Sequence, residues 1–277
     1  MSSISTSGVA LITGAAAGIG EETGYAFAQA GALGVVFADI HCKLAAENAE
    51  KSKAYATNTQ YRALSIKVDT TDPISVQEMV DFTVREFGRL DYNVNSAGLG
   101  ASSLAPTADV DINNFDAILN VNTRGVMLCV RAVSKFMISQ EPRTHTGRHG
   151  KQRSLGRGCI VNLGSVASFS AGRGMMAYVA SKHAVMGITK VAAFDNAKHE
   201  IRVNAVCPTW VETPMLDRGL KRWPALGESI KTKTPLGRAA DPEEVANVVV
   251  YLCSPSSSYI NGTGIMIDSG MSVTAHL

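Results

Sequence analysis

The sequence predicts a single α/β domain over residues 1–277, in which helices cover both faces of a doubly wound, parallel, seven-stranded sheet. Short runs rich in β-branched residues alternate along the chain with longer amphipathic stretches. Strands separated by helices pair in parallel through crossover connections. The 277 residues are 45% apolar and contain neither an internal repeat nor a linker rich in Pro, Gly and Ser, which indicates one domain with a sizeable core.

Each predicted strand is a short run with β-branched residues, and amphipathic stretches lie between these runs. The seven strands span residues 9–13, 34–39, 62–68, 90–95, 159–163, 201–206 and 264–268. The amphipathic stretches predict helices that include residues 21–30, 73–87, 113–137, 177–197 and 242–252. Because helices connect the strands, both faces of the sheet are expected to be covered.

Charge and composition exclude several classes of protein. Twenty-six Lys and Arg against 24 Asp and Glu give a net charge of +2, too small for general nucleic-acid affinity. No run approaches 18 apolar residues, and the N-terminus lacks the pattern of a secretory signal. Five widely spaced cysteines without a CxxC pair suggest neither a disulfide framework nor a zinc site. We expect a cytoplasmic protein that contacts neither membrane nor nucleic acid and holds no metal.

One segment, residues 141–157, departs from this balance. It carries five Lys and Arg residues against Glu141 alone, a local charge of 5 − 1 = +4. We interpret it as a solvated loop between a helix and the next strand, and an anion-docking patch is the alternative. The basic residues are Arg143, Arg148, Lys151, Arg153 and Arg157.

A glycine-rich turn follows the first strand directly and leads into a helix. It contains Gly14, Gly18 and Gly20. Glycine lets the chain turn sharply and lets backbone N–H groups approach a pyrophosphate at the positive end of a helix. The alternative is an ordinary tight turn, but the strand, the turn and the helix together predict a dinucleotide site.

An acidic residue, Asp39, ends the second strand about 20 residues beyond this turn, where a carboxylate can accept hydrogen bonds from a ribose diol. It would repel a 2′-phosphate, and the neighbouring residues 15–17 and 40 supply no cation to offset that repulsion. NAD is therefore favoured as the cofactor, with NADP as the alternative. Helix capping is the other interpretation of Asp39.

Tyr178 and Lys182 lie four residues apart in a helical pattern and so share one helix face. A nearby ammonium lowers the pKa of a phenol, as a proton donor or acceptor in hydride transfer requires. Ser165 follows the strand at 159–163, at the sheet edge where such folds bind ligands, and could hold a substrate carbonyl. Asn95 closes the fourth strand, where small neighbours leave room for a cofactor. Asn122 interrupts an apolar helical stretch, which implies a kink or a bound water.

Taken together, these motifs resemble those of the short-chain dehydrogenase/reductase family from about residue 9 to residue 270. The resemblance rests on TGxxxGIG at 13–20, Asp69, NSAG at 95–98, Asn122, Ser165, YVASK at 178–182 and P-x-x-x-x-T at 208–213. It implies a Rossmann fold and hydride transfer between NAD(P) and an alcohol or ketone.

The resemblance also implies a role for each matching residue. Tyr178 would be the general acid/base, Lys182 would modify its pKa and anchor the ribose, and Ser165 would position the carbonyl. Asn122 would hold a proton-relay water. Ile19 and Asn95 would contact the dinucleotide, Asp69 the adenine, and Val211 and Thr213 the nicotinamide amide.

The chain departs from the family pattern at three places. Gly164 stands where a second Ser is common, Thr209 replaces the usual Gly, and residues 268–270 read DSG rather than DGG. None of these removes a catalytic group. Thr209 puts the backbone geometry beside the nicotinamide in doubt, because a β-branched residue resists conformations that glycine tolerates.

Residues 213–238 are interpreted as a lid over the substrate. Apolar residues of this lid and near the strand ends favour a bulky apolar secondary alcohol or ketone, with a biosynthetic (secondary-metabolite) intermediate among the candidates. The alternative is that they pack the lid on the body or fill a subunit interface. These residues are Leu99, Phe169, Met175, Met176, Trp210, Met215, Leu216, Leu220, Trp223, Leu226 and Ile230.

Two other functions use the same residues. The site could act without net redox change, as in an isomerase, dehydratase or cyclase. The chain could instead be a dinucleotide-sensing binding protein that docks a partner through residues 141–157. The apolar helices at 113–137 and 177–197, together with the family resemblance, favour a homotetramer or homodimer.

Overall fold

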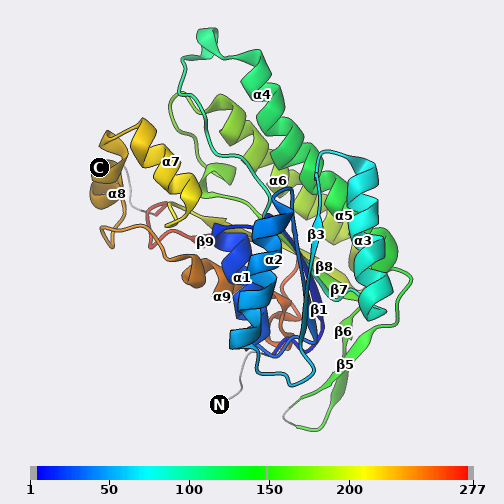
Figure 1. The fold of residues 1–277 in the computed structure, drawn as a ribbon. Coiled ribbons are helices and arrows are strands. Elements are labelled where there is room, and N and C mark those ends of the chain that lie inside the picture. The colour runs from blue at the N-terminus through cyan, green and yellow to red at the C-terminus, as the bar shows by residue number, and fades with distance from the viewer. Residues whose placement is uncertain (1–4, 148, 274–277) are drawn as a thin grey trace.

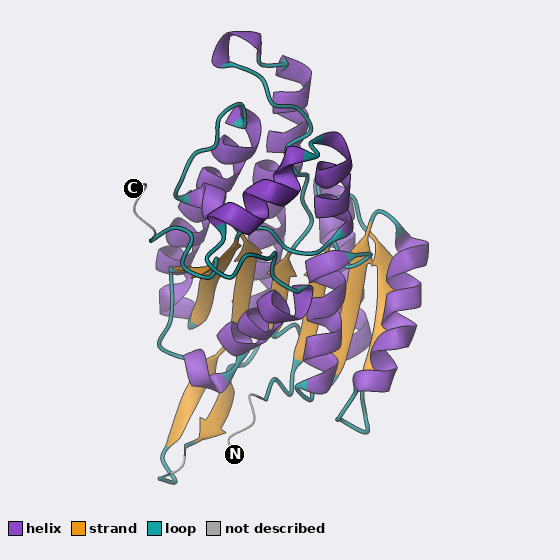
Figure 2. Ribbon diagram, turned by 90° about the vertical axis from the view of Figure 1, so that its left-hand side faces the viewer, coloured by secondary structure: helices purple, strands orange, loops and turns teal. Residues whose placement is uncertain are grey.

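The computed structural model describes residues 5–147 and 149–273, and its centre is a seven-stranded parallel sheet in the order β3-β2-β1-β4-β7-β8-β9. Helices lie on both sides of this sheet (Figure 1, Figure 2). The predicted doubly wound α/β fold is thereby confirmed. The strands are β1 (Val9–Thr13), β2 (Gly34–Asp39), β3 (Arg62–Lys67), β4 (Tyr92–Asn95), β7 (Gly158–Leu163), β8 (Ile201–Pro208) and β9 (Gly264–Ile267).

The strand order places a topological switch between β1 and β4. From β1 the chain winds outward to β2 and β3, and from β4 it winds the other way to β7, β8 and β9. Thr13 at the end of β1 lies beside Asn95 at the end of β4, and Asn95 lies beside Asn162 of β7. Ligands of open α/β sheets bind at the carboxyl ends of the strands beside such a switch.

Two large apolar cores and a small third cluster hold the helices against the sheet. Leu11 of β1 belongs to one core and Ile12 to the other, because successive side chains of a strand point to opposite faces. The helices are α1 (Gly18–Gln29), α2 (Cys42–Ser52), α3 (Pro73–Phe87), α4 (Ile112–Leu119), α5 (Val126–Met137), α6 (Met176–Asn196), α7 (Pro214–Arg222), α8 (Ala225–Lys233) and α9 (Pro242–Cys253). In the described part of the chain, no helix has the length and apolarity that crossing a membrane requires.

The long helix expected over residues 113–137 is interrupted. A π-helical segment, Asn120–Gly125, separates α4 from α5. Asn122 lies inside this segment, so the interruption that its amide implied is present. The widened turn brings Gly125 against Thr70, where a Cβ would lie 3.0 Å from the Thr70 Oγ1. Such π segments often occur at functional sites.

The basic segment expected as a solvated loop forms a β-hairpin instead. Strands β5 (Arg143–Thr146) and β6 (Gln152–Gly156) pair antiparallel, below the main sheet in Figure 1. Arg143 donates to the Ser7 Oγ at 2.7 Å, Arg153 donates to the Pro255 carbonyl at 2.8 Å, and Arg157 donates to the Gln140 carbonyl. Arg148 lies outside the described residues. The hairpin therefore uses three of its arginines to bind the body of the domain.

Candidate active site

The glycine turn after β1 is packed too closely for larger residues. Gly14 and Gly18 have φ angles of +70° and +60°, and a Cβ on Gly14 would lie 2.6 Å from the Ala97 nitrogen. A Cβ on Gly18 would lie 2.9 Å from the Thr213 Cγ2, and one on Gly20 would lie 2.2 Å from the Gly14 carbonyl oxygen. The turn therefore joins the segment after β4 to the start of α7 and keeps the N-terminus of α1 open.

The residues around this turn fit a dinucleotide. Ala17, the N-cap residue of α1, makes no side-chain hydrogen bond to the first N–H groups of the helix, which leaves them without that partner. Asp39 at the end of β2 accepts hydrogen bonds from the Ala16 N–H at 3.1 Å and the His41 N–H at 2.8 Å. His41, and not Asp39, is the N-cap residue of α2, so the structure contradicts the capping interpretation of Asp39.

A side chain that the sequence analysis missed also holds this turn. Asn48 of α2 is buried, and its Nδ2 donates to the carbonyls of Ala15 and Ala16 at 3.1 and 3.0 Å. The Tyr25 hydroxyl donates to the Asn48 Oδ1 at 3.3 Å. An amide on the apolar face of a helix was the available signal, because a buried amide needs partners.

The predicted catalytic side chains meet at the carboxyl end of β7. Ser165 follows that strand, and its hydroxyl is hydrogen-bonded to Tyr178 of α6. Lys182, one helical turn further along α6, donates from Nζ to the Leu163 carbonyl at 2.7 Å. Its Nζ lies 5.7 Å from the centre of the Tyr178 ring. Residues distant in sequence thus form one cluster around the phenol.

Burial controls the charges of this cluster. It raises the pKa of Tyr178, because the ionised phenol loses water, and the hydrogen bond to Ser165 opposes that effect only in part. It lowers the pKa of Lys182 to about 8. The expectation of a lowered pKa for Tyr178 is therefore not met in this structure, and Lys182 is not among the groups that shift that pKa.

Asn122 connects the π segment to the loop after β4 and to α6. Its Oδ1 accepts from the Leu99 N–H at 2.7 Å, while its Nδ2 donates to the Leu99 carbonyl at 2.9 Å and the Ser181 Oγ at 3.1 Å. A Cβ on Gly98 would lie 3.3 Å from this Oδ1 and 4.0 Å from the Lys182 Nζ. The side chain of Asn122 therefore fastens the loop after β4 to α6.

Within the described chain, Asn95 at the end of β4 has one paired and one unpaired polar atom in its side chain. Its Nδ2 donates to the Asn162 Oδ1 at 2.8 Å, and Asn162 in turn donates to the Thr189 Oγ1 at 2.9 Å. The Asn95 Oδ1 has no hydrogen-bond partner among the described residues. A buried carbonyl oxygen without a donor is unfavourable, so the site fits a ligand that supplies one.

The remaining predicted cofactor residues follow the carboxyl ends of β3 and β8 or lie in the first turn of α1. Thr213 donates to the Val211 carbonyl at 3.1 Å and caps α7 by accepting from the Leu216 N–H at 3.3 Å. Asp69, after β3, accepts from the hydroxyl and N–H of Thr71, and these hydrogen bonds lower the pKa of its carboxyl. Ile19, in the first turn of α1, packs against the apolar core beneath.

Two of the departures from the family pattern have structural explanations. A Cβ on Gly164 would lie 2.7 Å from the Sγ of Cys207 and 3.0 Å from the Ser168 Oγ, so the buried thiol occupies that space. Thr209 has a φ outside the left-handed region, and its N–H donates to the Ile267 carbonyl at 3.1 Å. Ordinary backbone geometry therefore accommodates Thr209, which removes the doubt about the conformation there.

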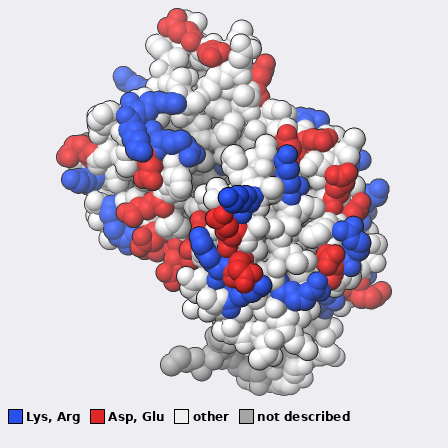
Figure 3. All heavy atoms as spheres, in the orientation of Figure 1, with Lys and Arg blue, Asp and Glu red and all other residues white. Residues whose placement is uncertain are grey.

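A pocket of mixed character lies beside Tyr178, and the segment expected as a lid supplies none of the described residues that line it. That segment forms α7 and α8, over which Lys and Arg side chains gather (Figure 3). Arg222 donates to the Ser102 carbonyl, and the buried Ile230 packs α8 on the body. The pocket is lined by Ala101, Ser103, Ala105, Val110, Asp111, Asn114, Ile118, Gly174, Met175, Met176, Ala177 and Tyr178.

Comparison with known proteins agrees with this geometry. A family profile described as enoyl-(acyl carrier protein) reductase matches residues 14–272. The short-chain dehydrogenase anuF of Penicillium roqueforti (strain FM164) is 45% identical over 263 residues, which cover 95% of each chain. The 3-oxoacyl-[acyl-carrier-protein] reductase FabG of Thermotoga maritima is 37% identical over 263 residues, 95% of this chain and 97% of that protein.

Solved structures show the same fold. Levodione reductase superposes with a TM-score of 0.84 at 31% identity, covering 98% of this chain and 99% of that chain. The chain therefore belongs to the short-chain dehydrogenase/reductase family. It is an NAD(P)-dependent oxidoreductase that acts on alcohol and ketone groups.

Proposed function

We propose that this oxidoreductase uses NAD and acts on a bulky apolar secondary alcohol or the corresponding ketone, with Tyr178 as the general acid/base. The observation that carries the proposal is the cluster of Ser165, Tyr178 and Lys182 at the carboxyl end of β7. This cluster adjoins the pocket that Tyr178 lines. One face of the phenol thus meets the buried lysine, and substrate can approach from the pocket.

The residues that would hold the cofactor lie at the glycine turn, on α6 and at or after the carboxyl ends of the strands. The N–H groups around Gly14, Gly18 and Gly20 would bind its pyrophosphate, and Asp39 and Lys182 would bind its two riboses. Ile19, Asp69, Asn95, Val211 and Thr213 would complete the site. When bound, the nicotinamide supplies or accepts the hydride.

The protein residues would manage the proton. In ketone reduction Tyr178 donates its hydroxyl proton to the carbonyl oxygen, and in alcohol oxidation it takes that proton back. Ser165, already hydrogen-bonded to Tyr178, would hold the same oxygen and orient it. The ammonium of Lys182 favours the phenolate formed during reduction. Because the Asn122 side chain is engaged by Leu99 and Ser181, a relay water would bind the main chain of the π segment.

Substitution of the phenol tests this assignment. Tyr178→Phe keeps the ring and removes the hydroxyl, so we expect kcat to fall by about 10²- to 10⁴-fold. The variant is expected to bind the dinucleotide still, and quenching of the protein fluorescence measures this binding. Tyr259→Phe, at a fully exposed tyrosine, is the matched control. Unimpaired turnover in Tyr178→Phe would remove the basis of the proposal.

The choice of NAD is supported by the carboxylate of Asp39. Two backbone N–H groups orient it beside the glycine turn. A 2′-phosphate placed there would meet like charge. We expect kcat/KM to be higher with NAD than with NADP. Asp39→Ser should reduce this preference for NAD. A wild-type preference for NADP would overturn this part of the proposal.

The substrate class is supported by the walls of the pocket, which include Val110, Met175 and Met176. A screen of apolar cyclic alcohols and ketones, read by the absorbance of the reduced cofactor, tests it. Turnover of sugars or short polar acids with no activity on apolar alcohols would contradict it. Turnover without change in the reduced cofactor would favour the isomerase, dehydratase or cyclase alternative.

We also propose a cytoplasmic homo-oligomer, a tetramer or a dimer. Its support is an apolar strip on the outer side of α6, where Val191 is 61% exposed and Phe194 is 85% exposed. Exposed apolar side chains of this size commonly mark a protein interface. The hairpin β5–β6 gives less support to a docking function, because three of its arginines are bound to the domain itself.

A further inference from the structure

We propose that Cys159 and Cys253 are a redox-active thiol pair, in which Cys159 reacts with a hydroperoxide and Cys253 closes a reversible disulfide. The pair lies at the amino end of β7, and the active site lies at the opposite, carboxyl end of the same strand. This inference is independent of the function proposed above.

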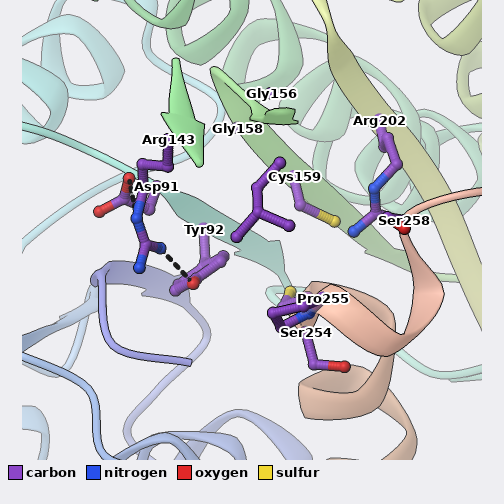
Figure 4. Close-up of a pocket in the computed structure, with 12 residues that line it drawn as sticks. Asp91, Tyr92, Arg143, Gly156, Gly158, Cys159, Arg202, Ser254, Pro255 and Ser258 are labelled. Carbon is purple, nitrogen blue, oxygen red and sulfur yellow. Dashed lines mark hydrogen bonds and ion pairs between the residues drawn. The ribbon is translucent and has the colours of Figure 1, made fainter. Parts of the chain in front are cut away.

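The two cysteines line one pocket. Cys159 is the second residue of β7, and Cys253 is the last residue of α9. The Cys159 Sγ donates to the Leu252 carbonyl at 3.2 Å, which places it against the residue before Cys253. A hydrogen bond also links the two thiols. Asp91, Tyr92, Arg143 and Arg202 are among the residues that line the same pocket (Figure 4).

Both thiols are shielded, but the pocket gives a small molecule a way to them. The two residues are only 3% and 4% exposed. Hydrogen peroxide is not much larger than water, whereas the thiols of other proteins and bulky alkylating reagents are too large for such a pocket. The surroundings therefore select a small oxidant.

Arg202 of β8 supplies a positive charge beside Cys159. The two residues are direct neighbours across the β7–β8 ladder. The Arg202 guanidinium donates to the carbonyls of Leu252 and Ile260 at 2.7 and 3.0 Å. Its buried Nε has no hydrogen-bond partner in the described part of the chain, and no carboxylate there pairs with Arg202. The guanidinium thus keeps an N–H donor and a charge that a thiolate can use.

These contacts make the two thiols unequal. The hydrogen bond from Cys253, followed by the effect of Arg202, lowers the pKa of Cys159 below the ordinary thiol value. Burial raises the pKa of Cys253 well above its ordinary value. Because the thiolate is the nucleophile, Cys159 is the attacking residue and Cys253 is the resolving residue.

The reaction balances with one hydroperoxide. The Cys159 thiolate attacks the peroxide oxygen, the O–O bond breaks, and the departing alkoxide or hydroxide takes a proton, which leaves a sulfenic acid on Cys159. The Cys253 sulfur then attacks the Cys159 sulfur, its proton and the sulfenic hydroxyl leave as water, and the S–S bond forms. Two thiols are oxidised, and the peroxide receives their two electrons. A dithiol reverses the process.

The experiment uses the full-length protein with its exposed cysteine, Cys42, replaced by Ser, because that thiol would react first. The C42S protein is treated with hydrogen peroxide, and its mass and disulfide-linked peptides are measured. We expect a product lighter by about 2 Da, for two hydrogens lost, with Cys159 joined to Cys253. Adding Cys253→Ser should leave a sulfenic acid on Cys159 that dimedone traps. Adding Cys159→Ser should abolish both products.

Cys129 supplies the matched control. It is buried like the pair, and burial raises its pKa to about 12, so adding Cys129→Ser should leave the 159–253 bond unchanged. The C42S protein itself, with no core residue altered, gives a second measurement: hydrogen peroxide should oxidise Cys159 faster than Cys129, because the pKa of Cys159 is lowered and that of Cys129 is raised. Oxidation of Cys129 as fast as Cys159, or a trapped sulfenic acid in C42S with no disulfide, would overturn the proposal.

Discussion

Substitution of Gly164 tests whether the Cys207 thiol fills the space behind the catalytic serine. Gly164 precedes Ser165, and its N–H donates to the Val206 carbonyl at 2.8 Å. A Cβ there would lie 2.7 Å from the Cys207 Sγ and 3.0 Å from the Ser168 Oγ, closer than atoms normally approach. Cys207 is fully buried in β8, so its sulfur cannot turn into solvent. One of these groups must move.

We expect Gly164→Ala to lower the free energy of unfolding by about 1–3 kcal/mol, the usual cost of overpacking. The substitution should also reduce kcat, because Ser165 shifts with its neighbour. Cys207→Ala empties the same space and is expected to cost about 1–2 kcal/mol by itself. In the double variant the new methyl group enters the space that the sulfur left. The two substitutions should therefore compensate by about 1–2 kcal/mol rather than add.

Urea unfolding of the four proteins of this cycle measures the compensation, and kcat is recorded in parallel. Gly187→Ala is the matched control, because its Cβ would meet no described atom within 4 Å on the exposed side of α6. That control should gain up to about 1 kcal/mol from higher helix propensity. Strict additivity in the cycle, or a Gly164→Ala protein as stable and active as the wild type, would refute the packing argument.

Three further predictions concern stability and assembly. Burial lowers the pKa of Lys182 from 10.5 to about 8, so the unfolded chain binds more protons than the folded chain between these pH values. The free energy of unfolding should therefore rise with pH across this window, by about 3 kcal/mol at most. Urea titrations of the wild type and of Lys182→Met at pH 7.5 and pH 10 measure this difference. Asp91 is buried and accepts hydrogen bonds from the Val9 N–H at 2.9 Å and from Arg89. Asp91→Ala should therefore lower the free energy of unfolding by about 3–5 kcal/mol, and a decrease below about 1 kcal/mol in thermal unfolding would contradict this. Phe194→Glu should lower the mass of the oligomer in light scattering, and an unchanged mass would exclude the α6 strip as an interface.

The sequence by itself determined the features that local physics records. Short runs rich in β-branched residues, alternating with longer helical patterns, marked all seven strands of the sheet, because parallel strands need helical crossovers between them. Spacing along one helix placed Tyr178 and Lys182 on neighbouring turns. The glycines after β1 were recognisable because few other residues adopt the positive φ found at Gly14 and Gly18.

The tertiary structure alone decided which distant residues become neighbours. Periodicity shows that a residue is buried but not what it packs against, so the strand order, the hydrogen bonds of Asn48 to the glycine turn and the thiol of Cys207 behind Gly164 could not be predicted. Composition predicted that residues 141–157 form a solvated loop, because it cannot show which backbone carbonyls lie close enough to accept hydrogen bonds from Arg153 and Arg157. The direction of the Tyr178 pKa was missed for the same reason: it depends on how much water the folded chain removes from the phenol, which only packing sets.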